Sequence, residues 1–238
     1  MFLELTATWD WRVHGFLDYQ GYVHPIDTDT KVISTVFERL SSPVIRTIAK
    51  RSGYVVELAN QTTYPDFTLS VSDPAGQVLH RIALDVKTTY ASNRMSFTLG
   101  GYNSFLVRPT KNILHHYDTY SEHWVLGFIY AQNPAFREYD LDSMPGNGEI
   151  ACPYRDVTLF IRRKHEITGL RAGSGNTKNI GSVMTRNPAE FQTVMGPFSH
   201  FSRGKQACDR YWAGYPHYCG LIGSPQELHD HPDFASYI

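Results

Sequence analysis

The sequence predicts an α/β or α+β fold, a single domain of 238 residues built on a central mixed β-sheet flanked by helices. One segment, residues 27–53, has apolar residues at helical spacing between capping signals. Residues 66–71 and 78–89 alternate polar and apolar side chains as half-buried strands do, and the apolar runs 123–131 and 157–161 are typical of buried strands. Because strands and helices follow each other at uneven intervals, a mixed sheet is expected.

The N-terminal part is predicted to form a hairpin followed by a long helix. Residues 13–26 mix aromatic and β-branched residues around glycines, which favours a hairpin. Residues 27–30 carry oxygen-bearing side chains that can cap a helix, and residues 50–53 combine a basic last turn with a glycine stop. Pro43 lies inside this segment and predicts a kink or a break into two helices.

The two alternating segments are predicted to pair with each other. Residues 72–76, Ser-Asp-Pro-Ala-Gly, lie between them and are typical of a turn. The chain after Met184 is aromatic and interrupted by proline and glycine, so its elements are not assigned from the sequence.

The composition is that of an ordinary globular protein and leaves the function open. Lys and Arg number 22 against 23 Asp and Glu, and this net charge of −1 counts mildly against a nucleic acid partner. An enzyme that holds divalent cations on carboxylates is locally acidic, however, so DNA is not excluded. No run of about 18 apolar residues predicts a membrane span, and no secretory signal peptide is expected. The three cysteines lack paired spacing, which favours a reducing cytosol.

One group of residues suggests chemistry: Pro65-Asp66, followed by Asp85-Val86-Lys87. Side chains two apart on a strand share a face, so Asp85 and Lys87 point the same way, and a hairpin would bring Asp66 close to Asp85. Paired carboxylates suit Mg²⁺, whose remaining positions water and a phosphate can fill. The metal would activate a water and stabilise charge on the phosphate, with Lys87 assisting.

This pattern is weak when it is taken alone. Asp29-Thr30-Lys31 has the same spacing, and Pro-Asp recurs at Pro232-Asp233. Only the set at 66, 85 and 87 lies in the right order on two amphipathic strands. On spacing alone, a pair of solvated carboxylates at a strand edge beside a lysine explains these residues more readily than an active site does.

Longer strings carry a resemblance to a known family. The strings TYPDFTL, IALDVKTTY, FTLGGYNSF and TKNI resemble the catalytic core of EcoRV-type restriction endonucleases, which are members of the PD-(D/E)xK nuclease superfamily. DTKVISTVFERLSSPVI resembles the active-site helix of that family, and LRAGSGNTKNIGS resembles its DNA recognition loop. These matches run in the same order over most of the chain, from about residue 13 to residue 182.

The resemblance implies a restriction-endonuclease-like fold and a type II restriction endonuclease, a hydrolase that requires Mg²⁺. It assigns Asp66 and Asp85 to metal binding, Lys87 to catalysis, and Glu38 to a further catalytic and metal-binding role. The implied enzyme is a homodimer in the cytoplasm of a bacterium. It cuts double-stranded DNA at GATATC to leave blunt ends with 5′-phosphates, and its host is expected to carry a cognate DNA methyltransferase.

The resemblance also implies a set of DNA-binding residues. They are Gln61, Thr88, Thr89, Ser104, Lys111, Asn112, Gly173, Ser174, Gly175, Asn176, Thr177, Lys178 and Asn179. In the loop from residue 173 to residue 177, glycines allow close backbone approach to base edges, while an amide and a methyl group can read the major groove. Taken without the resemblance, this loop is more readily a plain turn or a phosphate cradle, although the GK[ST] of a P-loop is absent.

The chain departs from the family pattern in three places. The turn between the two catalytic strands is longer, and Lys178 replaces a threonine of the recognition loop. The third departure is the C-terminal region, residues 183–238, which lacks the family's basic end and carries only a short matching fragment. The expected layout is a dimerisation hairpin and active-site helix (13–50), a catalytic core (54–182) and this divergent region.

The divergent region leaves backbone contacts to DNA in doubt. The basic residues Arg203, Lys205 and Arg210 are candidates to make these contacts in its place.

Three alternatives remain open at the level of sequence. A nuclease of the same superfamily acting in DNA repair is one, and a DNA-binding protein without catalysis is another. The third is a zinc site built from His217, His229, His231, Cys208 and Cys219, which their scattered spacing disfavours.

Overall fold

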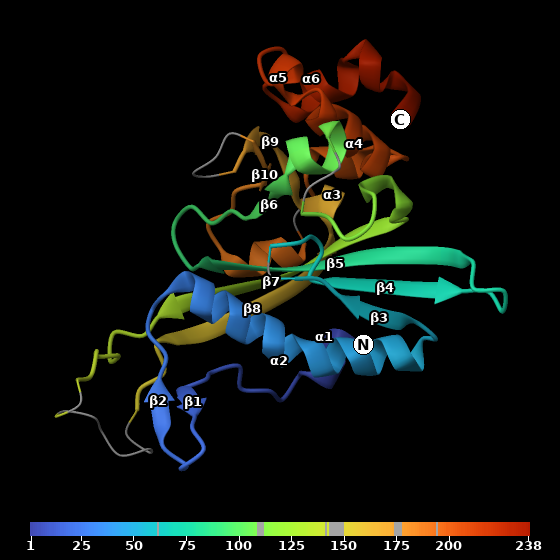
Figure 1. The fold of residues 1–238 in the computed structure, drawn as a ribbon. Helices are drawn as coiled ribbons and strands as arrows, with labels where there is room; N and C mark the ends of the chain where they lie inside the picture. The colour runs from blue at the N-terminus through green and yellow to red at the C-terminus, as the bar shows by residue number, and fades with distance from the viewer. Residues whose placement is uncertain (61, 109–111, 141, 143–149, 174–177, 194) are drawn as a thin grey trace.

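A five-stranded mixed sheet forms the centre of the computed structural model (Figure 1). The structure describes residues 1–238 except 61, 109–111, 141, 143–149, 174–177 and 194. Neighbouring strands are antiparallel except for the parallel pair β5 and β7. Across the sheet the order is β3 (Val55–Leu58), β4 (Phe67–Ser72), β5 (Val78–Tyr90), β7 (Glu122–Gln132) and β8 (Tyr154–Arg163). The predicted α/β class with a mixed sheet is therefore confirmed.

A long helix, α2 (Thr30–Arg51), covers one face of this sheet (Figure 1). Asp29 caps it, because its carboxylate accepts a hydrogen bond of 2.7 Å from the N–H of Lys31. The helix continues through Pro43, so of the two predicted alternatives, a kink or a break, the break into two helices is wrong. Its buried face carries Phe37, whose ring stacks on Phe128 of β7 at 4.4 Å, and this packing holds the helix together across the proline.

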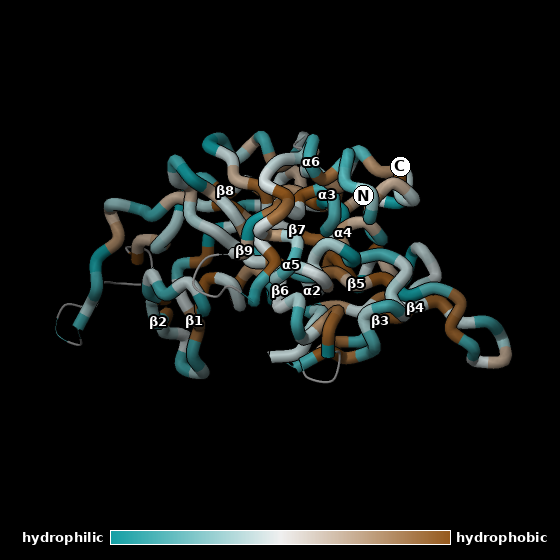
Figure 2. The backbone as a smooth tube through the Cα atoms, turned by 90° about the horizontal axis from the view of Figure 1, so that it is seen from above, coloured by the Kyte–Doolittle hydropathy of each residue, from teal (hydrophilic) through white to brown (hydrophobic). Residues whose placement is uncertain are grey.

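Two hydrophobic cores lie on opposite faces of the sheet. One fills the space between α2 and the sheet and includes Phe37, Val86 and Phe128. The other, on the opposite face, includes Ala83, Val125 and residues of the C-terminal region. Figure 2 shows that hydrophobic segments gather along the central strands, while hydrophilic segments dominate the loops that protrude at both ends. Burial on both faces explains why β7 reads as a continuous apolar run.

The predicted N-terminal hairpin is present and projects beyond the end of α2 (Figure 1). It consists of β1 (Gly15–Leu17) and β2 (Val23–Pro25), which pair in antiparallel fashion. A short helix, α1 (Phe2–Leu5), precedes it and packs near α2.

A second, three-stranded sheet lies on the face of the central sheet that α2 does not cover (Figure 1). Its order is β6 (Thr98–Gly101), β10 (Asn179–Ser182) and β9 (Thr168–Ala172), all antiparallel. The short helices η1 (Asn103–Val107) and η2 (Tyr117–Thr119) follow β6 along the chain. Because β9 and β10 are neighbours, they bracket the segment 173–178, which contains most of the expected recognition loop.

The C-terminal region folds into short helices that pack on this second sheet (Figure 1). They contribute Phe198, Trp212 and Phe234 to the core, which explains the aromatic composition. The elements of this region are η3 (Pro188–Gln192), η4 (Pro197–His200), α4 (Gly204–Ala213), α5 (Tyr215–Tyr218), α6 (Pro225–Asp230) and η5 (Pro232–Tyr237), and a further short helix, α3 (Lys164–Ile167), lies before β9. In the described part of the chain, no helix is long and apolar enough to span a membrane.

The three basic side chains considered for backbone contacts have partners within the protein. Arg210 pairs with Asp233 at 3.4 Å, and Lys205 pairs with Asp209 at 3.0 Å. The guanidinium of Arg203 donates to the carbonyl of Ser236 at 3.1 Å. The contacts of Arg203 and Arg210 tie the α4 region to the C-terminal residues, whereas the Lys205–Asp209 pair lies within α4.

Candidate active site

The pairing of β4 with β5 brings Asp66, Asp85 and Lys87 together. Phe67 lies opposite Leu84, so Asp66, immediately before β4, falls next to Asp85 in this antiparallel register. The Nζ atom of Lys87 lies 2.5 Å from Oδ2 of Asp85. This is the juxtaposition that the hairpin and the two-residue spacing predict from the sequence.

The electrostatics of this group are unfavourable for two charged carboxylates. Burial, reinforced by repulsion from Asp85, raises the pKa of Asp66 to about 8, although Lys87 and a hydrogen bond from the Val86 N–H oppose the shift. That hydrogen bond, 2.6 Å to Oδ2 of Asp66, also fixes the orientation of the carboxylate. Burial by itself would lower the pKa of Lys87, but attraction to Asp85 and Asp66 outweighs it and the pKa is raised. The single positive charge of Lys87 therefore does not offset the burial and the mutual repulsion of the two carboxylates.

These residues fit a hard divalent cation. The carboxylate oxygens of Asp66 and Asp85 are the ligands that Mg²⁺ prefers, and a bound cation would relieve the repulsion that raises the Asp66 pKa. Among the described residues, no group of three or more His, Cys, Asp or Glu side chains could hold a metal ion. The remaining ligands would then be water and substrate phosphate, as is usual for Mg²⁺. For the same reason, the His and Cys residues of the zinc alternative do not come together as a metal-binding group among the described residues.

Two pockets flank the pair of Asp66 and Lys87 and share them as a common wall. The smaller pocket has a volume of about 330 Å³, and the larger one about 840 Å³. Around the smaller pocket lie Thr62, Thr63, Tyr64, Asp66, Asp85, Lys87, Gly100, Gly101, Ser104, Phe105, Asn112 and Asn179. Around the larger one lie Thr30, Lys31, Ser34, Thr35, Glu38, Thr62, Asp66, Val86, Lys87, Thr88, Thr89, Tyr90 and Tyr130. The carboxylates are thus accessible from a groove between the two sheets and α2.

Glu38 lines the larger pocket but stands apart from the two aspartates. Its Oε1 lies 3.7 Å from the Arg39 guanidinium, and its charge contributes to the raised pKa of Lys87. Glu38 forms no metal-holding group with Asp66 and Asp85. Its metal role stays a prediction.

Five of the expected DNA-binding residues line these two pockets. Thr88 and Thr89 face the larger pocket, and Ser104, Asn112 and Asn179 line the smaller one. They come from β5, η1, the segment after η1 and β10, so elements far apart in the sequence meet around Asp66.

Two further expected residues form the base of the recognition loop. The N–H of Gly173 donates to the carbonyl of Asn179 at 2.9 Å, and the carbonyl of Lys178 accepts from the Tyr102 N–H at 3.0 Å. These bonds anchor both ends of the loop on β6 and the second sheet. Six predicted contact residues lie outside the described residues: Gln61, Lys111, Ser174, Gly175, Asn176 and Thr177.

Several pocket residues were not predicted from the sequence. Thr62 is shared by both pockets, while Lys31 and Thr35 line the larger one from α2. Lys31 belongs to the second Asp-x-Lys copy, which the sequence places in a capping turn. Lys31, Thr35 and Glu38 are four and three residues apart, and this spacing places them on one face of a helix. That spacing was the signal in the sequence that could have identified the side of the larger pocket formed by α2.

Comparison with known proteins places this geometry in a family. The family model described as restriction endonuclease EcoRV matches residues 7–237, and so includes the divergent C-terminal region. The type II restriction enzyme EcoRV of Escherichia coli is 42% identical over 180 residues, which are 72% of this chain and 71% of that protein. The chain therefore belongs to the EcoRV family of type II restriction endonucleases, site-specific deoxyribonucleases that act on duplex DNA.

Proposed function

We propose that this enzyme cleaves duplex DNA at the centre of GATATC, leaving blunt ends with 5′-phosphates, with Mg²⁺ held by Asp66 and Asp85. The observation that carries the proposal is the group of Asp66, Asp85 and Lys87 at the junction of two pockets. The smaller pocket also includes Asn179, the first residue of β10, and β9 and β10 bracket a loop that resembles the recognition loop of the family.

Each residue of the group has a distinct role in the proposed reaction. When bound, Mg²⁺ would supply an activated water and would neutralise charge on the scissile phosphate. Asp66, oriented by the Val86 N–H, and Asp85 hold the cation. Lys87, whose side chain is 25% exposed, keeps a positive charge beside the pocket because Asp85 holds it at 2.5 Å. There it stabilises the negative charge that develops on the phosphate.

Sequence recognition is assigned to the loop at residues 173–177. Its glycines permit the backbone to approach base edges, while the Asn176 amide and the Thr177 methyl offer contacts that distinguish base pairs. The central TA of the proposed site is a flexible step, and deformation of DNA there can cost on the order of 1–6 kcal/mol. Bending would therefore add selectivity at bases that the protein does not touch.

Digestion of a fully sequenced plasmid tests this proposal. In Mg²⁺ we expect discrete fragments whose blunt, 5′-phosphorylated ends all map to GATATC, and we expect no cutting in EDTA. Cuts at another sequence would overturn the assigned specificity. A smear or scattered nicks would favour a repair nuclease, and binding without any cutting would favour a DNA-binding protein.

We also propose that the enzyme acts as a homodimer, because cutting both strands of a palindrome requires two active sites related by a two-fold axis. The hairpin β1–β2 supports this, since Phe16, Leu17 and Tyr22 are exposed on it. Beside it, an apolar hollow of about 540 Å³ lies between Val13 and Phe16 of the hairpin region and Val32, Val36 and Leu40 of α2. A second copy of the chain would cover this surface.

The same proposal has a consequence for the host cell. An enzyme that cuts GATATC in the cytoplasm would destroy unprotected chromosomal DNA, so a methyltransferase for the same palindrome is expected beside it. Host DNA that the purified enzyme digests readily would contradict this expectation.

A further inference from the structure

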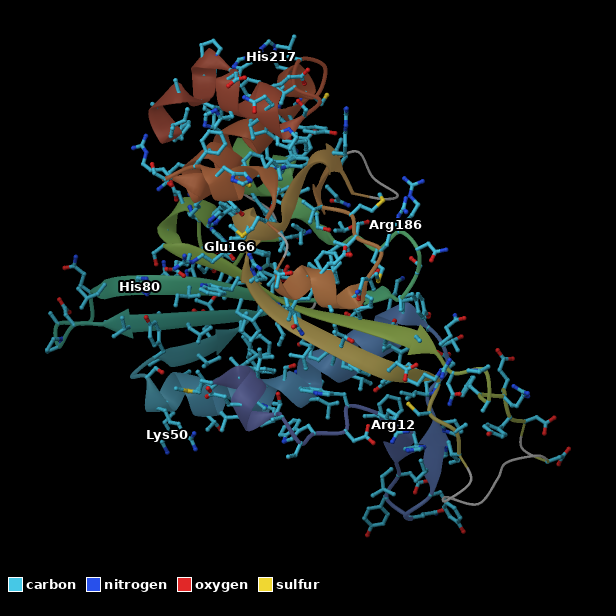
Figure 3. All side chains as sticks on the ribbon, turned by 180° about the vertical axis from the view of Figure 1, so that it is seen from behind. Arg12, Lys50, His80, Glu166, Arg186 and His217 are labelled. Atoms are coloured by element: carbon cyan, nitrogen blue, oxygen red, sulfur yellow. The ribbon has the colours of Figure 1, made fainter. Side chains whose placement is uncertain are left out.

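A lysine is buried in aromatic surroundings behind the proposed active site. Lys164, the first residue of α3, is only 4% exposed. Its Nζ atom lies 3.2 Å from the Tyr117 hydroxyl, 4.6 Å from the centre of the Phe105 ring and 5.1 Å from the ring centres of Tyr64 and Tyr117. Among the described residues, no carboxylate forms an ion pair with it. Figure 3 marks the position of α3 through Glu166, between the central sheet and the C-terminal helices.

The rings that surround this ammonium also form part of the active-site pocket. Tyr64 and Phe105 both line the pocket that contains Asp66 and Asp85, and their ring centres are 4.4 Å apart. Tyr64 lies two residues before Asp66, and Phe105 directly follows Ser104, which lines the same pocket. Lys164 is not among the lining residues of this pocket, but its ammonium contacts two rings that are.

Further contacts hold the aromatic cage of Tyr64, Phe105 and Tyr117 in place. The Tyr64 hydroxyl and Nδ1 of His123 are 2.7 Å apart, and the His123 ring stacks on Tyr117 at 3.9 Å. Phe105 in turn stacks on Tyr117 at 5.2 Å. Displacement of the ammonium would leave a gap that all three rings border.

Stability does not explain a charge at this position. Burial lowers the pKa of Lys164 to about 8, although attraction to Asp85, Cys208 and Asp209 opposes the shift. The side chain is therefore still a cation at neutral pH, in a site where it is desolvated. Burial of a charge without an ion-pair partner is costly, and apolar side chains of similar volume often replace even paired buried charges without loss of stability.

We propose that Lys164 is a positioning residue for DNA cleavage: its charge holds the aromatic cage and, through Tyr64 and Phe105, the pocket wall that presents Asp66 and Ser104. This inference rests on the active site assigned above. The proposal explains why a charged side chain without a carboxylate partner is buried here, because cation–π attraction draws the three rings toward the Lys164 ammonium. At neutral pH the ammonium also supplies a positive charge whose electrostatic attraction reaches Asp85.

Lys164→Met tests the proposal, because it keeps the length of the side chain and removes the charge. We expect an unfolding free energy in urea equal to or above that of the wild type. Binding of a GATATC duplex in Ca²⁺ should stay within about threefold of wild type, whereas kcat in saturating Mg²⁺ should fall about 10- to 100-fold, the usual loss when a residue supporting a metal site is changed. KM should hardly change, since the wall matters in the transition state.

Two further variants separate charge from packing. Lys164→Arg retains the cation and should recover most of the lost kcat, while Lys50→Met, which changes an exposed lysine at the end of α2, should leave every parameter unchanged. Tyr117→Phe removes only the hydroxyl that contacts Lys164 and should lower kcat less than Lys164→Met does.

Three results would overturn the proposal: wild-type kcat in Lys164→Met, an arginine variant as slow as the methionine variant, or a methionine variant that fails to fold. Asp85→Ala, measured in parallel, tests the underlying site independently. If that variant still cuts DNA, the active-site assignment fails, whatever the Lys164 variants show.

Discussion

The carboxyl group of Asp66 illustrates how single residues trade stability for function. Its pKa is raised to about 8 by burial and by the neighbouring Asp85. Strongly perturbed carboxyl groups are frequent at catalytic sites, because the arrangement that binds a cation is unfavourable without it. The two buried carboxylates that are proposed to hold the cation therefore lower the stability of the metal-free fold.

A dependence of stability on pH follows at Asp66. Its folded pKa of about 8 lies above the unfolded value, so the native state binds the proton more tightly, and stability falls as pH rises between about 4 and 8. Asp66→Asn should remove this loss. In EDTA at pH 8 the variant should exceed the wild type by several kcal/mol in urea unfolding, up to about 5 kcal/mol, because the Asp66 pKa is raised by about four units and each unit corresponds to about 1.4 kcal/mol. At pH 4 the two should agree, and parallel profiles over the whole range would contradict the assignment.

Removal of either carboxylate of the proposed metal site should separate binding from cleavage. Asp66→Ala and Asp85→Ala each delete a ligand of the proposed cation without touching the recognition loop, so duplex binding in Ca²⁺ should remain measurable. Cleavage in Mg²⁺ should fall at least about 10²–10³-fold, and Lys87→Ala should also be severely impaired. Asp29→Asn is the matched control, because Asp29 belongs to the other Asp-x-Lys copy and caps α2. Near-wild-type cutting by Asp85→Ala would remove the basis of the site.

At the scale of elements, close packing of β7 against β8 supports the catalytic strand. Gly127 of β7 pairs with Lys87 of β5 on one side and with Phe160 of β8 on the other. A Cβ atom at Gly127 would lie 2.2 Å from the Phe160 ring, so the ring covers the glycine directly. The packing beside the strand that carries Asp85 and Lys87 thus involves a glycine on β7, the strand between β5 and the edge strand β8.

Gly127→Ala should therefore destabilise the protein. We expect a loss of about 1–3 kcal/mol in urea unfolding, the usual cost of overpacking a rigid core. Gly220→Ala is the control, because its added methyl would meet nothing closer than 4.0 Å. Equal stability of the two variants would show that Phe160 can move aside at little cost.

At the scale of the whole molecule, the N-terminal hairpin has exposed apolar side chains. Leu17 is 72% exposed and Phe16 is 56% exposed, next to the apolar hollow on α2. A contiguous apolar surface of this kind is typical of a protein interface.

The double change Phe16→Glu and Leu17→Glu should yield a monomer, because charge repulsion and desolvation would oppose association of two copies. Sedimentation equilibrium measures the mass, and plasmid digestion should show loss of double-strand cutting in the same sample. Leu79→Glu is the control, since Leu79 is 65% exposed at the far tip of the β4–β5 hairpin. A wild-type enzyme that is monomeric and fully active would contradict the dimer.

Much of the catalytic geometry could be predicted because it is local. Asp66 and Asp85 lie on adjacent strands joined by a short turn, so alternation and turn chemistry suffice to bring them together. The cap of α2 at Asp29 was predictable for the same reason. The break expected at Pro43 is absent because tertiary packing of Phe37 on the sheet outweighs the local cost of the proline.

By itself, the sequence determined the fold class, the hairpins, the long helix and the pattern of candidate catalytic residues, because each depends on side chains close together along the chain. Tertiary structure alone decided the parallel pairing of β5 with β7, the helical C-terminal region and the burial of Lys164 behind Tyr64. These features depend on contacts between distant segments, such as residues 64 and 164, whose free energy is gained only when the whole core closes. The local periodicity of apolar residues along the sequence therefore does not predict such contacts.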